Sequence, residues 1–191
     1  GHQVTAVARH PEKMAAHPAL TAVAADVENV DRIAELAKGK DAVISAYNPG
    51  WTNPDQPRLI AQNNPLILEA VRRSGVKRVL IVGGAGTLFC APGLRVVDAG
   101  VIPDEILAAV REVGNFHLNV VEKERDLDWA YFCPAGEIAP GERTGKFRLG
   151  KDDLIVDAEG KSRISVEDYA VAMVDELERP AHHRERFTIG Y

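Results

Sequence analysis

Short apolar segments alternate with amphipathic helical patterns along most of this chain, and this alternation restricts the possible folds more than any other feature. Residues 27–37 show the helical pattern clearly, because Val30, Ile33, Ala34 and Ala37 fall on one face of an α-helix. The apolar segments are nearly continuous, as in strands that are buried on both faces. Five such strands are expected, at residues 4–8, 20–24, 42–46, 79–82 and 129–132. The pattern therefore predicts an α/β fold, in which helices cover both faces of one parallel sheet.

The last part of the chain, residues 135–191, is organised differently. It holds two short apolar segments, 154–156 and 187–189, and one helix with Ser165 as its N-cap, Asp168 at the capping-box position and Pro180 as its stop. No linker or internal repeat separates this part from the rest. We therefore expect a single domain of 191 residues, with residues 135–191 as a small C-terminal lobe.

Composition excludes several classes of protein. The net charge is −5 and no cluster of lysine and arginine is present, which argues against binding to nucleic acid. The longest uncharged run, residues 79–94, is shorter than the roughly 20 apolar residues of a membrane helix. Cys90 and Cys133 match no disulfide or metal spacing, and the pair His182–His183 has no further ligand nearby. We expect a cytoplasmic protein without a metal site.

An arginine follows the first expected strand directly. In a dinucleotide-binding fold, the end of the second strand meets the adenosine ribose, where an acid favours NAD and an arginine favours the 2′-phosphate of NADP. Arg9, with His10 and Lys13 nearby, fits the second case. On this interpretation residues 4–8 are the second strand of the fold. One strand, a glycine-rich turn and a helix, roughly 20–25 residues in all, are then expected before Gly1.

Several segments resemble one known group of proteins. The segments are "GHQVTAVARHPEKM", "DAVISAYNPG", "VKRVLIVGGAGTL", "DLDWAYFCPA", "APGERTGKFRLG" and "RISVEDYAVAMVDELE". Together they resemble the atypical short-chain dehydrogenase/reductases, and within them the NmrA-like group often labelled NADH-flavin reductases; biliverdin reductase B is a more distant relative. The resemblance implies a Rossmann-type doubly wound sheet that binds NADP, with NAD as the alternative. Members carry G-x-x-G-x-x-G upstream of the position of Gly1, and this sequence does not contain that motif.

The resemblance also implies roles for residues at the ends of two strands. Residues 83–87 end the strand that runs under the nicotinamide, where Gly83 and Gly84 let the ring approach the backbone. Thr87 is the nearest hydroxyl and a candidate hydrogen-bond donor to the reacting groups. Pro134, which closes the strand at 129–132, is expected beside the cofactor. The alternative for the glycines is a turn that uses them for positive φ.

Two further groups are expected near the cofactor. Family members use the position of Asp26 beside the adenine, through its side chain or through the amide of Val27; the alternative is that Asp26 is the N-cap of the following helix. Ala46, Tyr47 and Asn48 end the strand at 42–46, where the topology of the sheet places the cofactor crevice.

Four aromatic residues could supply a wall for a flat acceptor, or simply pack in the core and loops. They are Tyr47, Trp51, Phe89 and Phe132.

The usual catalytic pair of short-chain dehydrogenases, Tyr-x-x-x-Lys, is absent, because no tyrosine of this chain has a lysine four residues further on. Alcohol oxidation or sugar epimerisation by the usual mechanism is therefore disfavoured. His117 lies on the helix that normally carries the pair. It contacts either the substrate or the nicotinamide, or it is a histidine at the edge of the core.

The function that remains is hydride transfer from NADPH to an acceptor that needs no strong acid from the protein, such as a flavin or a quinone. The main alternative is a non-catalytic sensor of NADP that acts through a protein partner. A third possibility is an interaction protein that has lost cofactor binding. The sequence leaves a homodimer open.

Overall fold

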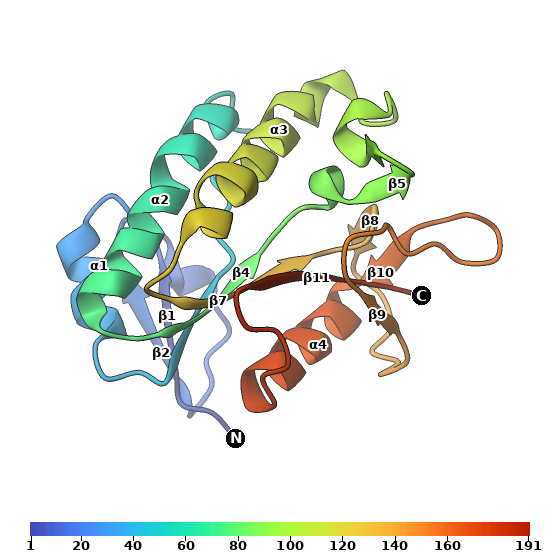
Figure 1. Cartoon of the computed structure of the whole chain (residues 1–191). Coiled ribbons are helices and arrows are strands. Elements are labelled where there is room, and N and C mark those ends of the chain that lie inside the picture. Colours follow the sequence, from blue (N-terminus) through green and yellow to red (C-terminus); the bar gives the residue numbers. More distant parts are fainter.

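The computed structural model describes residues 1–191 and has three layers (Figure 1). Helices α2 (Gln56–Ser74) and α3 (Asp104–Asn119) lie on one face of the central sheet, and α4 (Val166–Glu178) lies on the other. Helix α1 (Val30–Ala37) packs against α2. This arrangement confirms the doubly wound α/β fold predicted from the alternation of strands and helices.

The main sheet has five strands in the order β3-β4-β7-β11-β9. Strands β3 (Ala42–Ser45), β4 (Arg78–Val82), β7 (Asp128–Cys133) and β11 (Glu185–Gly190) run parallel, and β9 (Arg148–Gly150) is antiparallel to β11. Because β9 and β11 belong to this sheet, much of the expected C-terminal lobe is built into the main layer.

Strands β1 (Val4–Ala8) and β2 (Leu20–Ala24) form a separate parallel pair. The expectation of a single sheet was wrong in this respect, because β1 bonds only to β2 and β3 bonds only to β4. The contact between α1 and α2 keeps the pair beside the main sheet.

Two small sheets complete the strands. Strands β5 (Phe89–Ala91) and β6 (Leu94–Arg95) are antiparallel, whereas β8 (Glu137–Ala139) and β10 (Arg163–Ser165) are parallel. Residues 154–156, expected as a strand, form none. Instead Ile155 packs over Gly150 and Gly190, whose missing side chains leave room for it.

The starts of two helices follow their capping residues. Asn29 caps α1, since its Oδ1 accepts a hydrogen bond from the Arg32 amide at 3.1 Å. The alternative role of Asp26 as this N-cap was therefore wrong; its Oδ1 accepts from the Glu28 amide within a turn. Ser165 caps α4 as predicted, with its Oγ accepting from the Asp168 amide at 3.0 Å.

The core lies on both faces of the main sheet. Val79 and Ile81 of β4 belong to the cluster under α2 and α3, and Leu80 between them belongs to the cluster under α4. All three are at most 3% exposed. Burial on both faces is the physical reason why this strand reads as a continuous apolar run.

A buried ionic cluster joins the amino end of β4 to the connection between α4 and β11. The Arg78 guanidinium donates to Glu176 Oε1 at 2.6 Å and to the carbonyl oxygen of His182 at 2.8 Å. Glu176 Oε1 also accepts from the amides of Ala181 and His182, and Glu176 Oε2 lies 2.8 Å from His182 Nδ1. Arg78 and Glu176 are only 9% and 5% exposed, so both charges need compensation; Arg78 receives it from Glu176 and from Asp128, whose Oδ2 lies 3.2 Å from Nη1.

Candidate functional site

The carboxyl ends of three neighbouring strands bring several predicted residues to one edge of the main sheet. Ala46–Asn48 follow β3, Gly83–Gly84 follow β4, and Pro134 follows β7. The Gly83 amide donates to the carbonyl oxygen of Phe132 at 2.7 Å, which fixes the turn after β4 beside β7. Ala46 and Asn48 are exposed, whereas Pro134 is buried. We refer to this region as the carboxyl edge.

The end of the β1–β2 pair forms a second part of the site. The Ala25 amide donates to the carbonyl oxygen of Ala8 at 3.2 Å, so that Arg9 and Asp26 follow neighbouring strand ends. Both residues are exposed, and no carboxylate of the chain pairs with the Arg9 guanidinium. An unpaired guanidinium next to an exposed carboxylate can meet a phosphate on one side and a ring amine on the other.

The loop after β3 is ordered by its own side chains. Asn48 Oδ1 accepts from the Gly50 amide at 2.8 Å and from Gln56 Nε2 at 3.1 Å. The Tyr47 hydroxyl accepts from Asn63 Nδ2 at 2.8 Å. These bonds tie the loop to α2 and hold its backbone at the carboxyl edge.

Gly83 and Gly84 are glycines because of packing, and neither has positive φ, so the alternative based on positive φ was wrong. A Cβ on Gly83 would lie 2.3 Å from Cε1 of the Tyr131 ring, and one on Gly84 would lie 3.1 Å from Cγ1 of Val113. The turn after β4 therefore needs these glycines in order to approach β7 and α3 closely.

Replacing Gly83 with alanine is expected to lower the free energy of unfolding by about 1–3 kcal/mol, because the buried Tyr131 ring has no room to move. Gly84→Ala, which meets only one methyl group of Val113, should cost less. Urea denaturation of both variants measures the difference. Equal small losses would contradict the packing explanation.

Thr87 is 3% exposed and its hydroxyl faces the interior. Its Oγ1 accepts from Arg186 Nη1 at 3.2 Å, and its methyl group lies against Gly114 of α3. The structure therefore buries this hydroxyl under α3 and does not present it at the carboxyl edge.

His117 is 1% exposed and stacks on Tyr131 with ring centroids 4.2 Å apart. Burial, together with the charges of Arg186 and Arg95, lowers the pKa of His117 to about 4, so the ring is neutral at neutral pH. It shares a cavity with Trp129 and Arg186, near the amino ends of β7 and β11. His117 therefore lies away from the carboxyl edge, which is at the other end of these strands, and its expected contact with nicotinamide or substrate stays a prediction.

Two tyrosines are also internal. The Tyr131 hydroxyl donates to the carbonyl oxygen of Val113 at 3.2 Å, and the Tyr169 hydroxyl donates to that of Phe132 at 2.7 Å. Burial raises the pKa of both hydroxyls well above the usual value. Neither group is suited to give a proton to a bound substrate.

The four aromatic candidates separate in the structure. Phe132 is core, stacked between Tyr169 and Phe187 at centroid distances of 4.2 and 4.1 Å. Trp51 is 65% exposed on the loop after β3. Only Trp51 is therefore fully available to a flat molecule at the carboxyl edge, with Tyr47 half-buried beside it.

Asp168 is a functional candidate that the sequence analysis assigned only to a helix cap. It is completely buried and accepts from the Thr144 hydroxyl at 2.5 Å, the Gly145 amide at 2.8 Å and the Tyr191 hydroxyl at 2.9 Å. Although burial alone would raise it, these hydrogen bonds lower the pKa of Asp168. Since Tyr191 directly follows β11, Asp168 fastens the 141–147 segment at the carboxyl ends of the strands.

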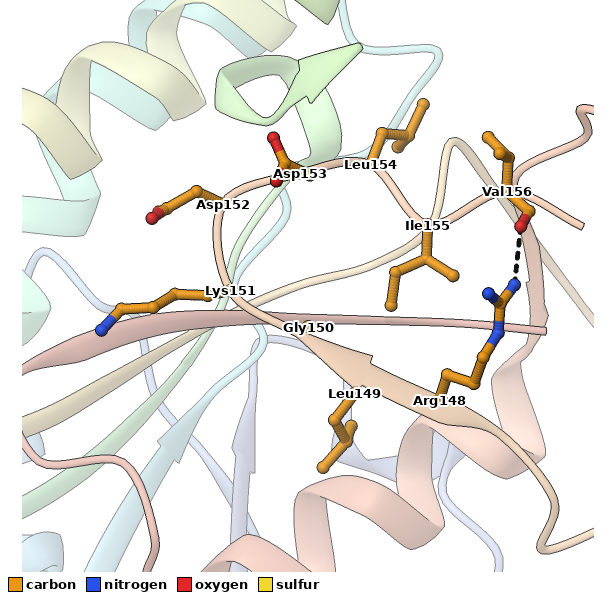
Figure 2. A pocket seen from close by; sticks show the side chains of 9 residues that line it. All are labelled: Arg148, Leu149, Gly150, Lys151, Asp152, Asp153, Leu154, Ile155 and Val156. Carbon is orange, nitrogen blue, oxygen red and sulfur yellow. Dashed lines mark hydrogen bonds between the residues drawn. The ribbon is translucent and has the colours of Figure 1, made fainter. Parts of the chain in front are cut away.

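A cavity of about 450 Å³ is lined by a single stretch, residues 148–156 (Figure 2). The Arg148 guanidinium donates across it to the carbonyl oxygen of Val156 at 2.6 Å. Ile155 fills its floor over Gly150. None of the predicted cofactor residues lines this cavity.

The structure holds no group of three or more His, Cys, Asp and Glu side chains arranged to bind a metal ion. None of its helices combines the length and the hydropathy that crossing a membrane requires.

The fold and the carboxyl edge together define a dinucleotide-binding protein of the Rossmann type. A family model described as NAD(P)H-binding matches residues 1–180, and the chain belongs to this family. This confirms the NAD(P)-binding family that the resemblance implied.

Three relatives match almost the whole of this chain. The chain is 35% identical to the uncharacterized protein YwnB of Bacillus subtilis, over 99% of this chain and 87% of that protein. A structure from Bacteroides thetaiotaomicron, provisionally named an epimerase, is 52% identical with a TM-score of 0.91, over 99% of this chain and 85% of that one. A structure from Streptococcus pneumoniae, provisionally named an NADH-flavin reductase, is 30% identical with a TM-score of 0.84, over 100% of this chain and 88% of that one.

Proposed function

We propose that this protein is an NADPH-dependent reductase that transfers hydride to a flavin, a quinone or a similar flat acceptor. The observation that carries the proposal is the carboxyl edge itself, which has the exposed residues Ala46 and Asn48 and an exposed tryptophan but lacks the tyrosine–lysine pair that usually protonates a carbonyl. A flavin or quinone accepts a hydride from C4 of the nicotinamide and takes its proton from water, which leaves NADP⁺ and the reduced acceptor. The protein then supplies proximity and orientation.

Each group of predicted residues contacts a different part of the cofactor. Arg9 pairs with the 2′-phosphate, and Asp26 with the Val27 amide lies beside the adenine. Ala46, Tyr47 and Asn48 line the cofactor on one side of the carboxyl edge, and Gly83, Gly84 and Pro134 line it on the other. Thr87 supports the turn from below rather than touching the acceptor. The name epimerase given to one relative is disfavoured for this chain, because the tyrosine–lysine pair of the usual mechanism is absent.

We also propose that a further parallel strand, followed by a glycine-rich turn and a helix, lies between β1 and β3 and supplies the pyrophosphate site. The unpaired edges of β1 and β3 support this proposal, as do their exposed apolar side chains: Val4 is 47%, Val7 36% and Ile44 44% exposed. Strand edges of this kind are open to pairing.

If this strand is present, it lies between β1 and β3 and forms hydrogen bonds with both. The amides on the facing edges of β1 and β3 should then exchange slowly with deuterium in protein isolated from its natural source, because the neighbouring strand protects them. Hydrogen exchange read by mass spectrometry measures this. The amides of β4, which are paired on both sides, provide the internal reference. Rapid exchange along both edges would contradict the proposal.

No tyrosine is expected to act as the catalytic acid. Tyr→Phe changes at Tyr47, Tyr131 and Tyr169 should each leave the kcat of hydride transfer largely intact, because Tyr131 and Tyr169 are buried and Tyr47 lacks the lysine partner of the usual catalytic pair. A loss of about 10²-fold or more at one of them, the scale of general acid catalysis, would overturn this expectation.

The main alternative is a sensor that binds NADP without turnover. Oxidation of NADPH, followed by its absorbance with flavin mononucleotide or menadione present, separates the two functions. Steady turnover that depends on the acceptor supports the reductase. Tight binding of NADPH without turnover supports the sensor.

A further inference from the structure

A second cavity, of about 430 Å³, lies on the α3 side of the main sheet near the amino ends of β7 and β11. It is lined by His117 and Trp129 together with several charged residues, among them Arg125, Arg184 and Arg186. The strands separate it from the carboxyl edge, which lies at their other end. We call it the amino-end cavity, and its properties do not depend on the proposed reductase activity.

His117 brings an unsatisfied polar group to this cavity. The ring is 1% exposed, and neither Nδ1 nor Nε2 has a hydrogen-bond partner. The nearest carboxylate oxygen, Oε1 of Glu122, lies 3.8 Å from Nδ1, which is too far for a hydrogen bond. Because buried polar groups are almost always paired, two unpaired nitrogens on one ring indicate that a partner is missing.

Two arginines at the cavity are held in place by backbone carbonyls and pair with no carboxylate. Arg184 Nε donates to the carbonyl oxygen of Leu127 at 3.2 Å, and both of its Nη groups are unpaired. Arg125 Nη1 donates to the carbonyl oxygens of Glu122 and Glu124 at 2.7 and 3.1 Å, which leaves its Nη2 and Nε free. These two guanidiniums are thus positioned without being neutralised.

The other charges of the cavity are compensated within the chain. Arg186 Nε donates to Asp152 at 3.1 Å, and Lys151 lies 3.6 Å from Glu185. After these pairs are set aside, Arg125 and Arg184 remain against the single exposed carboxylate of Glu122. The uncompensated charge in the cavity is therefore positive.

The backbone at Arg184 gives an independent indication. Its φ of 54° makes it the one residue other than glycine with positive φ, and it is held there by a hydrogen bond of 2.7 Å from its amide to the carbonyl oxygen of Trp129. A left-handed arginine is disfavoured, and such strain is concentrated at sites where it positions a functional group.

We propose that the amino-end cavity binds a small oxyanion, a phosphate or carboxylate group, between the guanidiniums of Arg125 and Arg184 and the N–H of His117. A guanidinium group can donate two parallel, charge-assisted hydrogen bonds to two oxygens of a planar carboxylate or of a tetrahedral phosphate. The neutral imidazole donates one hydrogen bond, which satisfies one of the two unpaired ring nitrogens.

Titration with inorganic phosphate and with malonate tests the proposal, while the ring nitrogens of His117 are followed by ¹H–¹⁵N NMR at constant ionic strength set by sodium chloride. We expect saturable shifts of the His117 signals, and the anion that binds more tightly identifies phosphate or carboxylate as the preferred group. Arg184→Gly relieves the backbone and removes the guanidinium, so it should weaken binding at least about tenfold, the lower end for hydrogen bonds to a charged group. The matched control is Arg179→Ala, an exposed arginine that pairs with Asp175 outside the cavity and should leave binding unchanged.

Three results would overturn the proposal. The first is the absence of a saturable shift with either anion, or the same shift with sodium chloride alone. The second is an equal loss of affinity in Arg184→Gly and Arg179→Ala. The third is a change of the His117 signals in anion-free Glu122→Ala without any anion response in the wild type, since the missing partner would then be Glu122.

Discussion

Replacing Glu176 with glutamine is expected to lower the free energy of unfolding by about 3–5 kcal/mol, because it removes the shorter of the two ion pairs of the buried Arg78 guanidinium and leaves only the contact with Asp128 at 3.2 Å. For a domain of 191 residues this corresponds to a fall in Tm of roughly 6–20 °C. Thermal and urea denaturation at neutral pH measure both quantities. The reciprocal change, Arg78→Met, should lower the free energy of unfolding by a similar amount, since it leaves the buried Glu176 carboxylate without its guanidinium partner.

The control lies on the same helix. Asp175 and Arg179 form an exposed pair at 2.7 Å, and Asp175→Asn should cost less than about 1 kcal/mol. If Glu176→Gln were as mild as Asp175→Asn, the ionic cluster would not stabilise the connection between α4 and β11.

The effect of Glu176 also depends on pH in a definite direction. Burial alone would raise the pKa of Glu176, but hydrogen bonds from the side chain and backbone of His182 lower it. A carboxyl group with a lowered pKa in the folded state stabilises the fold above the pKa of the unfolded state, about 4.3. This contribution is lost as the pH falls through the folded-state value. The difference between wild type and Glu176→Gln should therefore shrink in acid.

Replacing Arg9 with alanine is expected to weaken NADPH binding by about tenfold to a hundredfold and to leave NADH nearly unchanged. The guanidinium is exposed and has no carboxylate partner, so it is free to meet the 2′-phosphate with two charge-assisted hydrogen bonds, worth roughly 1.5–3 kcal/mol. NADH offers only a neutral hydroxyl at that position. Titration of wild type and variant with both cofactors at fixed ionic strength measures the effect.

Arg179→Ala provides the comparison for Arg9, as an exposed arginine after α4 that pairs with Asp175. Equal small effects of Arg9→Ala on both cofactors would mean that Arg9 is merely a solvated residue on a turn. Equal affinities of the wild type for NADPH and NADH would remove the argument for NADP.

Local pattern was sufficient to predict most of the fold. The run Val79–Ile81 could be read as a central strand because its burial on both faces leaves no polar alternation. The cap of α4 could be read because Ser165 and Asp168 lie within one turn of each other. The segment 154–156 misled the same reasoning: its apolar residues fill space over two glycines instead of pairing as a strand.

The site was less predictable, because its decisive contacts join residues far apart in the sequence. The close approach of Gly83 to Tyr131 and the bonds from Thr144 and Tyr191 to Asp168 depend on tertiary packing. His117 was placed on the correct helix, but the sequence did not show which end of the sheet it faces. Asp168 was hidden by its second role at the cap. No local pattern signals its role beyond the cap, because that role depends on the packing of Thr144, Gly145 and Tyr191 around the carboxylate.

The central claim is that the carboxyl edge passes hydride from NADPH to a flat acceptor, and the isotope dependence of that step tests it most directly. The measurement is anaerobic single-turnover reduction of flavin mononucleotide by the protein with NADPH, compared with NADPH that carries deuterium at the transferred position of C4. We predict reduction of the flavin that requires the protein and is slower with the deuterated cofactor, because the C4–H bond breaks in the transfer. Bound NADPH that reduces neither flavin mononucleotide nor menadione, or identical rates for the two isotopes, would contradict the claim.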